Sequence, residues 1–536
     1  MIRWSTLIAL VGLLAGAVVY DRVSIAPEPP APVAAAPVET PKLNDPGRQS
    51  TVWYCPIGSS DESMLADHSV VVSNVGSTPV SAEVAVLTGN GAGPALRFEV
   101  APLTSEVVKL SDLAMSPVAG AVVDVVGGDA VVSHEVVAAF GAPSGPCHTS
   151  LAEEWYFASG ATSRGANDYI ALLNPFASDI VFTATFQTET RTREPGELDR
   201  AVVPARSVLL IDVGAYVSRE AVVATTIKTV QGGRLAVERL QTFNGELGPV
   251  GASLSLGVAT PRSTWTFPAG RVQRGGDNFI RVFNPSDEVA QVDLELDPLD
   301  PTDRATYGLV PIELTIQPGR VLNFDLGAAL ETYPLPVSYE LGVTAISTTG
   351  TPVVVDNWQL TPKIDTSLIG AGGDAATADD AAVEEEPVVE EEPAVDPGQA
   401  ESDALLEERL SDPALAPPIQ PDPTVGITSS HGVAQLATRW IIPQMQTLDG
   451  GRSVVVVSAP EGALVEVRLI VAGQVLDPVR VSVPASGRAL IELAPVSSSA
   501  VVLVQSDSPI AAVGSVVNPD VDRQLVAGIP IVRNAE

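Results

Sequence analysis

Apolar and polar residues alternate along several short stretches of this chain. The pattern is clear at residues 182–188, 292–296 and 465–469. Successive side chains of a β-strand point to opposite faces of its sheet, so a period of two predicts a strand with one buried face. Val and Thr, which are frequent in these stretches, fit the pleated surface of a sheet. The pattern therefore predicts an all-β protein.

Four tryptophans, each at the start of a short apolar segment, divide the chain into repeats. The openers are Trp53-Tyr54-Cys55-Pro56, Trp155-Tyr156-Phe157-Ala158, Trp265-Thr266-Phe267-Pro268 and Trp440-Ile441-Ile442-Pro443. About seven short strands in roughly a hundred residues are typical of an antiparallel sandwich of the immunoglobulin-like type. We expect four tandem sandwich repeats that share few contacts, with each tryptophan in a core.

Two turn signals recur inside the repeats. In the first three repeats a strand ends at an asparagine: Asn74, Asn174 and Asn284. In all four repeats a proline turn follows later in the sequence, at Pro102, Pro204, Pro318 and Pro484. Asparagine tolerates unusual backbone angles and proline presets one, so both predict turns between strands. The fourth repeat lacks the asparagine.

The N-terminus predicts a membrane anchor. Residues 4–20 carry no charge and follow Arg3, which favours a cytoplasmic N-terminus. As a helix they span about 25 Å, near the lower limit for crossing a bilayer. An uncleaved signal anchor is the preferred interpretation. Cleavage near Ala15-Gly16-Ala17, which leaves a secreted protein, is the alternative.

Residues 369–437 have the composition of an acidic linker. The runs at residues 384–386 and 390–392 are all glutamate, and Pro387 and Pro393 interrupt them. Self-repulsion and proline predict disorder. Leu405, Leu406 and Leu410 leave open a short helix that folds on a partner.

These marks give seven segments: a signal anchor at 1–24, a Pro-rich spacer at 25–49, sandwich repeats at 50–150, 151–262 and 263–368, the disordered acidic linker at 369–437, and a fourth repeat at 438–536.

Charge and composition exclude several classes of protein. The chain has 65 acidic and 30 basic residues, a net charge of −35. A nucleic-acid binder needs a basic face, so that function is not expected. Four histidines and two cysteines are too few for a protein with several zinc sites or for a dense disulfide scaffold. No cofactor is expected.

The two cysteines predict one disulfide, Cys55–Cys147. Disulfides persist outside the cytoplasm, and Cys55 opens the first repeat while Cys147 follows its last strand. Free thiols, or a metal site with His148 as a neighbour, are the alternatives.

Other candidate residues lack a catalytic context. His68, His134, His148 and His431 lie in no hydrolase or metalloprotease motif. The evenly spaced Asp297, Asp300 and Asp303 are interpreted as a solvated hairpin loop, with a weak calcium site as the lesser alternative. Trp358 is the candidate surface aromatic for a glycan, and core packing is its alternative.

These motifs carry a resemblance. The N-terminal anchor, the Pro-rich spacer, the Trp-Tyr-Cys-Pro opener and the closing strand Val237-Glu238-Arg239 look like those of the actinobacterial family of unknown function DUF5719. The resemblance implies an anchored envelope protein whose members are often encoded near a cell-envelope glycosyltransferase. It supplies no catalytic residue.

The sequence therefore predicts a non-enzymatic structural or interaction protein of the cell envelope, single-pass in the cytoplasmic membrane with its bulk outside. Its expected partners are envelope proteins or cell-wall glycans. A glycan-binding module and an accessory scaffold for an envelope glycosyltransferase are the alternatives.

Overall fold

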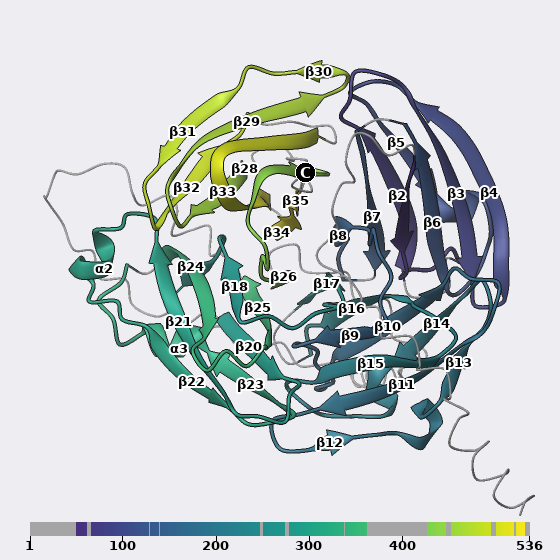
Figure 1. Cartoon of the computed structure of the whole chain (residues 1–536), viewed down its shortest axis with the longest axis horizontal. Helices are drawn as coiled ribbons and strands as arrows, with labels where there is room; N and C mark the ends of the chain where they lie inside the picture. Colours follow the sequence, from purple (N-terminus) through teal and green to yellow (C-terminus); the bar gives the residue numbers. More distant parts are fainter. Residues whose placement is uncertain are drawn as a thin grey trace, which may run out of the picture. The chain divides into compact units, whose positions relative to one another are not determined.

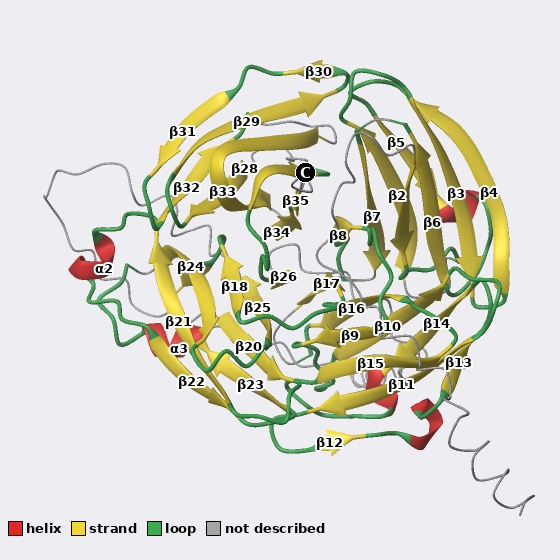
Figure 2. Ribbon diagram, viewed as in Figure 1, coloured by secondary structure: helices red, strands yellow, loops and turns green. Residues whose placement is uncertain are grey.

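The computed structural model describes most of the chain between residues 50 and 530. The described ranges are 50–61, 66–127, 129–138, 140–246, 250–273, 278–336, 338–361, 426–445, 452–494, 500–518 and 521–530. The expected anchor, the Pro-rich spacer and most of the acidic linker lie outside these residues. Strands make up 61% of the structure and helices 5%, which confirms an all-β protein (Figure 2).

The strands form antiparallel sheets that come in pairs (Figure 1). In each pair we call the sheet that contains the tryptophan strand the opening sheet, and its partner the closing sheet. In pair 1 the opening sheet has the order β1-β6-β3-β4 and the closing sheet β5-β2-β7-β8. The strands are β1 (Ser50–Cys55), β2 (Ala66–Asn74), β3 (Val80–Thr88), β4 (Gly91–Val100), β5 (Ser105–Lys109), β6 (Ala119–Val126), β7 (Ala130–Ala138) and β8 (Ser144–Pro146), with the 3₁₀ helix η1 at Leu110–Asp112.

Pairs 2 and 3 repeat this order. Pair 2 contains β9 (Glu154–Phe157), β10 (Ala166–Asn174), β11 (Ile180–Gln187), β12 (Thr192–Arg193), β13 (Ala201–Val203), β14 (Ser207–Asp212), β15 (Ala224–Gln231), β16 (Ala236–Asn244) and β17 (Val250–Leu256), with η2 (Gly196–Leu198) and η3 (Val213–Ala215). Pair 3 contains β18 (Thr264–Phe267), β19 (Arg271–Gln273), β20 (Asn278–Asn284), β21 (Ala290–Pro298), β22 (Ile312–Ile316), β23 (Arg320–Asp325), β24 (Ser338–Ser347), β25 (Val354–Thr361) and β26 (Gly426–His431), with α2 (Asp303–Thr306) and α3 (Leu326–Leu330).

Pair 4 departs from the others in one strand. It contains β27 (Ala437–Ile442), β28 (Arg452–Ala459), β29 (Ala463–Val471), β30 (Gln474–Val475), β31 (Val479–Val483), β32 (Gly487–Glu492), β33 (Ala500–Asn518), β34 (Val521–Ala527) and β35 (Ile529–Pro530). The 19-residue β33 pairs first with β27 and β29 and then with β28. One continuous strand thus serves both sheets, where pairs 1 to 3 use two strands.

The strand order differs from that of an immunoglobulin domain at two positions. In that fold the first strand lies beside the second and the seventh beside the sixth. Here β1 pairs with β6, and β7 pairs with β2. The central neighbours of the fold, β2 with β5 and β3 with β6, are kept. Relative to that order, the first and seventh strands have exchanged sheets, and β8 adds an eighth strand beside β7.

In pairs 2 and 3 a tryptophan and an asparagine join the two sheets through hydrogen bonds. Trp53, Trp155, Trp265 and Trp440 are at most 2% exposed, as expected for core residues. The indole N–H of Trp155 donates to the Leu235 carbonyl at 2.9 Å, and Trp265 makes the equivalent bond to Val353 at 2.8 Å. The Asn174 amide donates to the carbonyls of Ser178 and Val203, which closes a turn and joins it to β13. The asparagine therefore does more than form a turn.

Residues 426–431 form a strand, so the predicted end of the disordered linker at 437 is wrong, whereas β27 begins within one residue of the predicted start of the fourth repeat at 438. β26 pairs with β25 in register from Asp356↔His431 to Thr361↔Gly426, and Val433 then bridges to Thr266. The acidic segment is thus inserted between the last two strands of pair 3. No such insertion precedes the equivalent strands of the other pairs, β8, β17 and β34. The sequence did not predict β26, because this short polar strand shows no alternation of apolar and polar residues.

Apolar cores also join neighbouring pairs, which contradicts the expected beads with few shared contacts. Ile441, Ile470, Val501 and Ile529 of pair 4 share the core of pair 1. Pair 1 shares a second cluster with pair 2, pair 2 contributes to the core of pair 3, and Ala269 of pair 3 packs with β28. The contacts therefore run from the first pair to the fourth and back to the first.

We predict that the protein stays in one piece after its acidic segment is cut. A specific protease site placed at residues 384–392 gives two fragments, and the C-terminal one carries β26 and pair 4. Because β26 pairs with β25 and pair 4 contacts pairs 1 and 3, the fragments should co-elute in native size-exclusion chromatography and separate in denaturant. Separation in native buffer would contradict this arrangement.

Candidate functional site: buried polar junctions between sheet pairs

Several deeply buried charged and polar side chains lie where neighbouring pairs meet. On β16 every residue from Ala236 to Phe243 is buried, so both faces of the strand are covered. Glu238 on one face of the strand meets pair 1, whereas Arg239 and Phe243 on the opposite face reach the junction with pair 3. The motif Val237-Glu238-Arg239, which the sequence indicated only as a closing strand, therefore supplies the junctions.

A chain of hydrogen bonds joins pair 1 to pair 2. His68 Nδ1 lies 3.0 Å from the Ala119 carbonyl oxygen, and His68 Nε2 lies 3.0 Å from His134 Nδ1. His134 Nε2 lies 2.8 Å from Glu238 Oε1 on β16. All three side chains are at most 1% exposed. Desolvation, together with the neighbouring His134, lowers the pKa of His68 to about 3, so its ring is neutral in the fold.

Two buried guanidinium groups lie between pairs 2 and 3. Arg239 donates to Ser159 Oγ at 2.9 Å, and Ser159 in turn donates to Asp356 Oδ2 at 2.6 Å. Arg281 donates to Asn323 Oδ1 at 2.9 Å, and its guanidinium carbon lies 4.1 Å from the centre of the Trp358 ring. Desolvation, with Arg239 nearby, lowers the pKa of Arg281 to about 9, which leaves it cationic at neutral pH. These charges stay buried because partners of opposite charge or with acceptor atoms surround them.

Asp168 is a buried carboxylate for which the described residues provide no hydrogen-bond donor. It is 0% exposed, and neither oxygen has a partner. Desolvation is the main cause that raises its pKa to about 7, while Arg239 acts in the opposite direction. A Cβ on Gly160 would lie 2.2 Å from Oδ2, so this glycine makes room for the carboxyl group.

The position of Asp168 is polar in every pair. His68, Asp168 and Asn278 each precede the buried asparagine by six residues, and Ser453 holds the same register in pair 4. All four are buried. No recurring residue type marks this position in the sequence, because the residue changes from repeat to repeat.

Arg488 joins pair 4 to pair 3. It is 4% exposed, and it donates from Nε to the Pro268 carbonyl at 2.7 Å and from Nη1 to the Asp297 carbonyl at 2.7 Å. At the equivalent turn of pair 3, Arg320 donates to Thr192 of pair 2. In pair 1 the turn accepts instead, at the Leu103 carbonyl, from the Gly473 N–H of pair 4. The recurring proline turns are thus contact points between pairs.

The disulfide Cys55–Cys147 is present, with Cα atoms 4.8 Å apart. Both cysteines are 0% exposed, and the bond lies in the core of pair 1. The neighbouring His148 donates from Nε2 to the Val237 carbonyl at 2.8 Å and packs edge-on against Trp155. It therefore joins pairs 1 and 2, and the alternatives of free thiols and a cysteine metal site are wrong.

The candidate cation and glycan residues have protein partners. Asp297 accepts from Arg304 and Thr344, Asp303 accepts from the Tyr339 hydroxyl, and Asp300 accepts from Thr302. Trp358 is 6% exposed and packs between Phe243 and Phe279, so it is a core residue and not a surface aromatic. The side chain of His431 lies outside the described residues.

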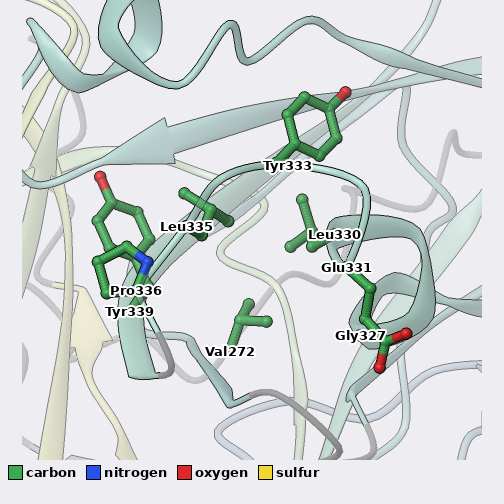
Figure 3. A pocket seen from close by; sticks show the side chains of 8 residues that line it. All are labelled: Val272, Gly327, Leu330, Glu331, Tyr333, Leu335, Pro336 and Tyr339. Carbon is green, nitrogen blue, oxygen red and sulfur yellow. The ribbon is translucent and has the colours of Figure 1, made fainter.

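A small pocket lies beside α3 in pair 3. Its lining comes from β19, α3, the following loop and β24: Val272, Gly327, Leu330, Glu331, Tyr333, Leu335, Pro336 and Tyr339 (Figure 3). Its volume is about 20 Å³, which holds one water-sized group. A sugar ring does not fit there without movement of the lining.

Two features are absent from the described residues. No group of three or more His, Cys, Asp or Glu in this part of the chain is placed to hold a metal ion. Within the same ranges, no helix has the length and apolar character needed to span a membrane.

Comparisons with known proteins identify no family. No family model matches the chain, and no curated protein matches it. One similar solved structure is the crystal structure of Thermotoga maritima 1070, which is 21% identical over 19% of this chain and 82% of that one, with a TM-score of 0.15. A likeness this low carries no argument about fold or function.

We predict that Asp168→Asn stabilises the protein. The folded state holds the Asp168 proton up to about pH 7, whereas the unfolded chain loses it near 3.8. The contribution of Asp168 to the free energy of unfolding is therefore greatest below pH 3.8. It falls by up to about 4 kcal/mol as the pH rises to 7. Asparagine, the residue that pair 3 carries at this position, removes that loss.

The expected gain at pH 7 and above is roughly 1–4 kcal/mol in the free energy of unfolding, measured by denaturant titration, and it should vanish near pH 4. Asp67→Asn, which changes an exposed carboxylate, is the matched control and should have no effect. A destabilised Asp168→Asn protein at pH 7 would show that the carboxylate is needed in its charged form.

Proposed function

We propose that this chain is a non-enzymatic structural or interaction protein of the cell envelope. In this proposal residues 4–20 anchor it in the cytoplasmic membrane, and four immunoglobulin-like sandwich repeats with exchanged end strands form its extracytoplasmic part. The disulfide supports an oxidising compartment, because such bonds persist outside the cytoplasm. The resemblance to the DUF5719 family supports the same location.

The observation that carries the proposal is the return of contacts from pair 4 to pair 1. Pair 4 shares the core of pair 1, and its Gly473 N–H donates to Leu103. Such a circuit fixes the position of each pair through two neighbours. Several deeply buried charged groups, among them Glu238 and Arg488, are engaged in these junctions. A fixed body of this kind is suited to presenting binding segments in a constant geometry.

The insertion of the acidic segment supports a scaffolding role. Thr361 and Gly426, which flank it, are opposite one another in the β25–β26 ladder. The two described ends that flank residues 362–425 therefore lie side by side. An acidic segment held in this way is suited to a partner with a basic surface, for which an envelope glycosyltransferase is the candidate given by the resemblance. Glycan binding is less favoured, because Trp358, its candidate surface aromatic, is buried.

Two measurements test the proposal. We expect the protein to retain Met1 and to fractionate with membranes; recovery of a soluble form that begins between residues 18 and 33 would remove the anchor from the proposal. We also expect cross-linking in cells to capture the same envelope protein repeatedly, and glutamine in place of the six glutamates at 384–386 and 390–392 to reduce that capture at least several-fold.

The control for the second measurement is Glu→Gln at Glu83, Glu246 and Glu492, which are surface carboxylates in ion pairs. This variant should keep the capture. Equal capture by both variants and the wild type would contradict a role for the acidic segment, and the melting temperature checks that each variant folds.

A further inference from the structure

The junction between pairs 1 and 2 contains an uninterrupted chain of titratable groups. It runs from the Ala119 carbonyl on β6 through His68 on β2 and His134 on β7 to Glu238 on β16. The second oxygen of Glu238 accepts from the Ile57 N–H at 3.4 Å. The separations of 2.8–3.0 Å are hydrogen-bond distances. They are shorter than the roughly 3.3 Å between two nitrogen ligands of one zinc ion, so no metal ion lies between these groups.

The Ala119 carbonyl, at one end of the hydrogen-bond chain, determines the direction of each hydrogen bond. The Ala119 carbonyl can only accept, so His68 Nδ1 carries the proton. The neutral His68 ring then offers the lone pair of Nε2, and His134 Nδ1 must donate to it. The contact between His134 Nε2 and Glu238 Oε1 needs one further proton, held on either atom. The closed junction therefore contains three protons on these three side chains.

When the junction opens and water reaches these three side chains, they hold a different number of protons. In water the two imidazoles have pKa values of about 6.5 and the carboxylate about 4.3. Above pH 6.5 the opened groups hold two protons, so closing the junction takes one proton up. Between about pH 4.3 and 6.5 they hold four, so closing releases one. The closed state is favoured most where these two effects balance.

We propose that His68, His134 and Glu238 form a proton-dependent latch between pairs 1 and 2, which is closed most firmly between about pH 6 and 7 and is loosened by both acid and base. With one proton fewer, a buried carboxylate faces a lone pair. With one proton more, either two N–H groups of the histidines face each other or a buried cation has no counter-charge. Each case removes a hydrogen bond or leaves a buried charge without a partner.

The other charged and titratable groups near the junction, among the described residues, point away from it or bond elsewhere. On the same strands, the neighbouring Asp67 is exposed and Glu135 is half-buried, and both follow the alternation to the opposite face of the sheet. Arg239, next to Glu238, bonds to Ser159 at the junction with pair 3. His148, from the segment after β8, bonds to the Val237 carbonyl. Among the charged groups near it, His134 is the one that affects the pKa of His68.

The test is Glu238→Gln in the full-length protein. The glutamine amide can donate to His134 Nε2, and its oxygen can accept from the Ile57 N–H. The closed junction of this variant therefore keeps its hydrogen bonds with only two titratable protons. Above pH 6.5 it takes up no proton on closing. Hydrogen exchange of the β7 and β16 amides, corrected for intrinsic rates, reports the opening constant from pH 5 to 8.5. Glu246→Gln, on the surface of pair 2, is the matched control.

One proton changes an opening constant tenfold per pH unit. From pH 7 to 8.5 we expect opening of the wild type to increase tenfold per unit relative to Glu238→Gln. From pH 6 to 5 we expect Glu238→Gln to open a further tenfold per unit relative to the wild type, because its closing releases two protons. The Glu246→Gln control should follow the wild type, and parallel pH profiles for wild type and Glu238→Gln would overturn the latch.

A second measurement does not depend on any variant. The chain has four histidines, so NMR of ¹⁵N-labelled histidine rings resolves them individually. We expect His68 as the neutral ring protonated at Nδ1, with no titration down to about pH 5. A proton on Nε2 of His68, or titration of the His68 ring near pH 6.5 in the folded protein, would overturn the proposal.

Discussion

The structure depends on the requirement that polar groups buried on both faces of a sheet find partners inside the protein. A closing sheet that meets a neighbouring pair cannot turn its second face to water. The side chains on that face must be apolar or must be bonded across the junction. Glu238 meets this requirement through His134 of pair 1, Asp356 through Ser159 of pair 2, and Arg488 through backbone carbonyls of pair 3. The junctions therefore select how the pairs dock, in the way that a core selects how two sheets pack.

Each junction meets the same requirement with different chemistry. Pairs 1 and 2 use histidines and a carboxylate, pairs 2 and 3 use two arginines and an aspartate, and pairs 3 and 4 use one arginine on carbonyl oxygens. Pairs 4 and 1 rely mostly on apolar residues such as Ile441 and Val501. A pair docked in the wrong place would leave a charge buried without a partner. This difference gives each pair a specific neighbour although all four share a similar strand order.

The sequence predicted the strands, the core tryptophans and the disulfide, because these depend on local alternation and on the small number of cysteines. It did not predict the junctions. The buried position shared by His68, Asp168 and Asn278 has no constant residue type, and only the strand register reveals it. β26 was also missed, because a polar strand that follows an acidic insertion shows no periodicity. Trp358 was misplaced for a related reason: its burial depends on Phe243 of another pair.

The pairing of β26 with β25 has a consequence for the order in which the chain can fold. Residues 278–361 supply three strands of the closing sheet of pair 3, and the fourth arrives only after residues 362–425 have been synthesised. Until then β25 presents an unpaired edge, which is open to other strands. Pair 1 likewise obtains its pair 4 neighbours last, so its native contacts span almost the whole folded chain. Contacts of such long sequence separation slow folding. The nascent protein therefore passes through a period in which it needs protection from aggregation, and that period ends only when the last strands arrive.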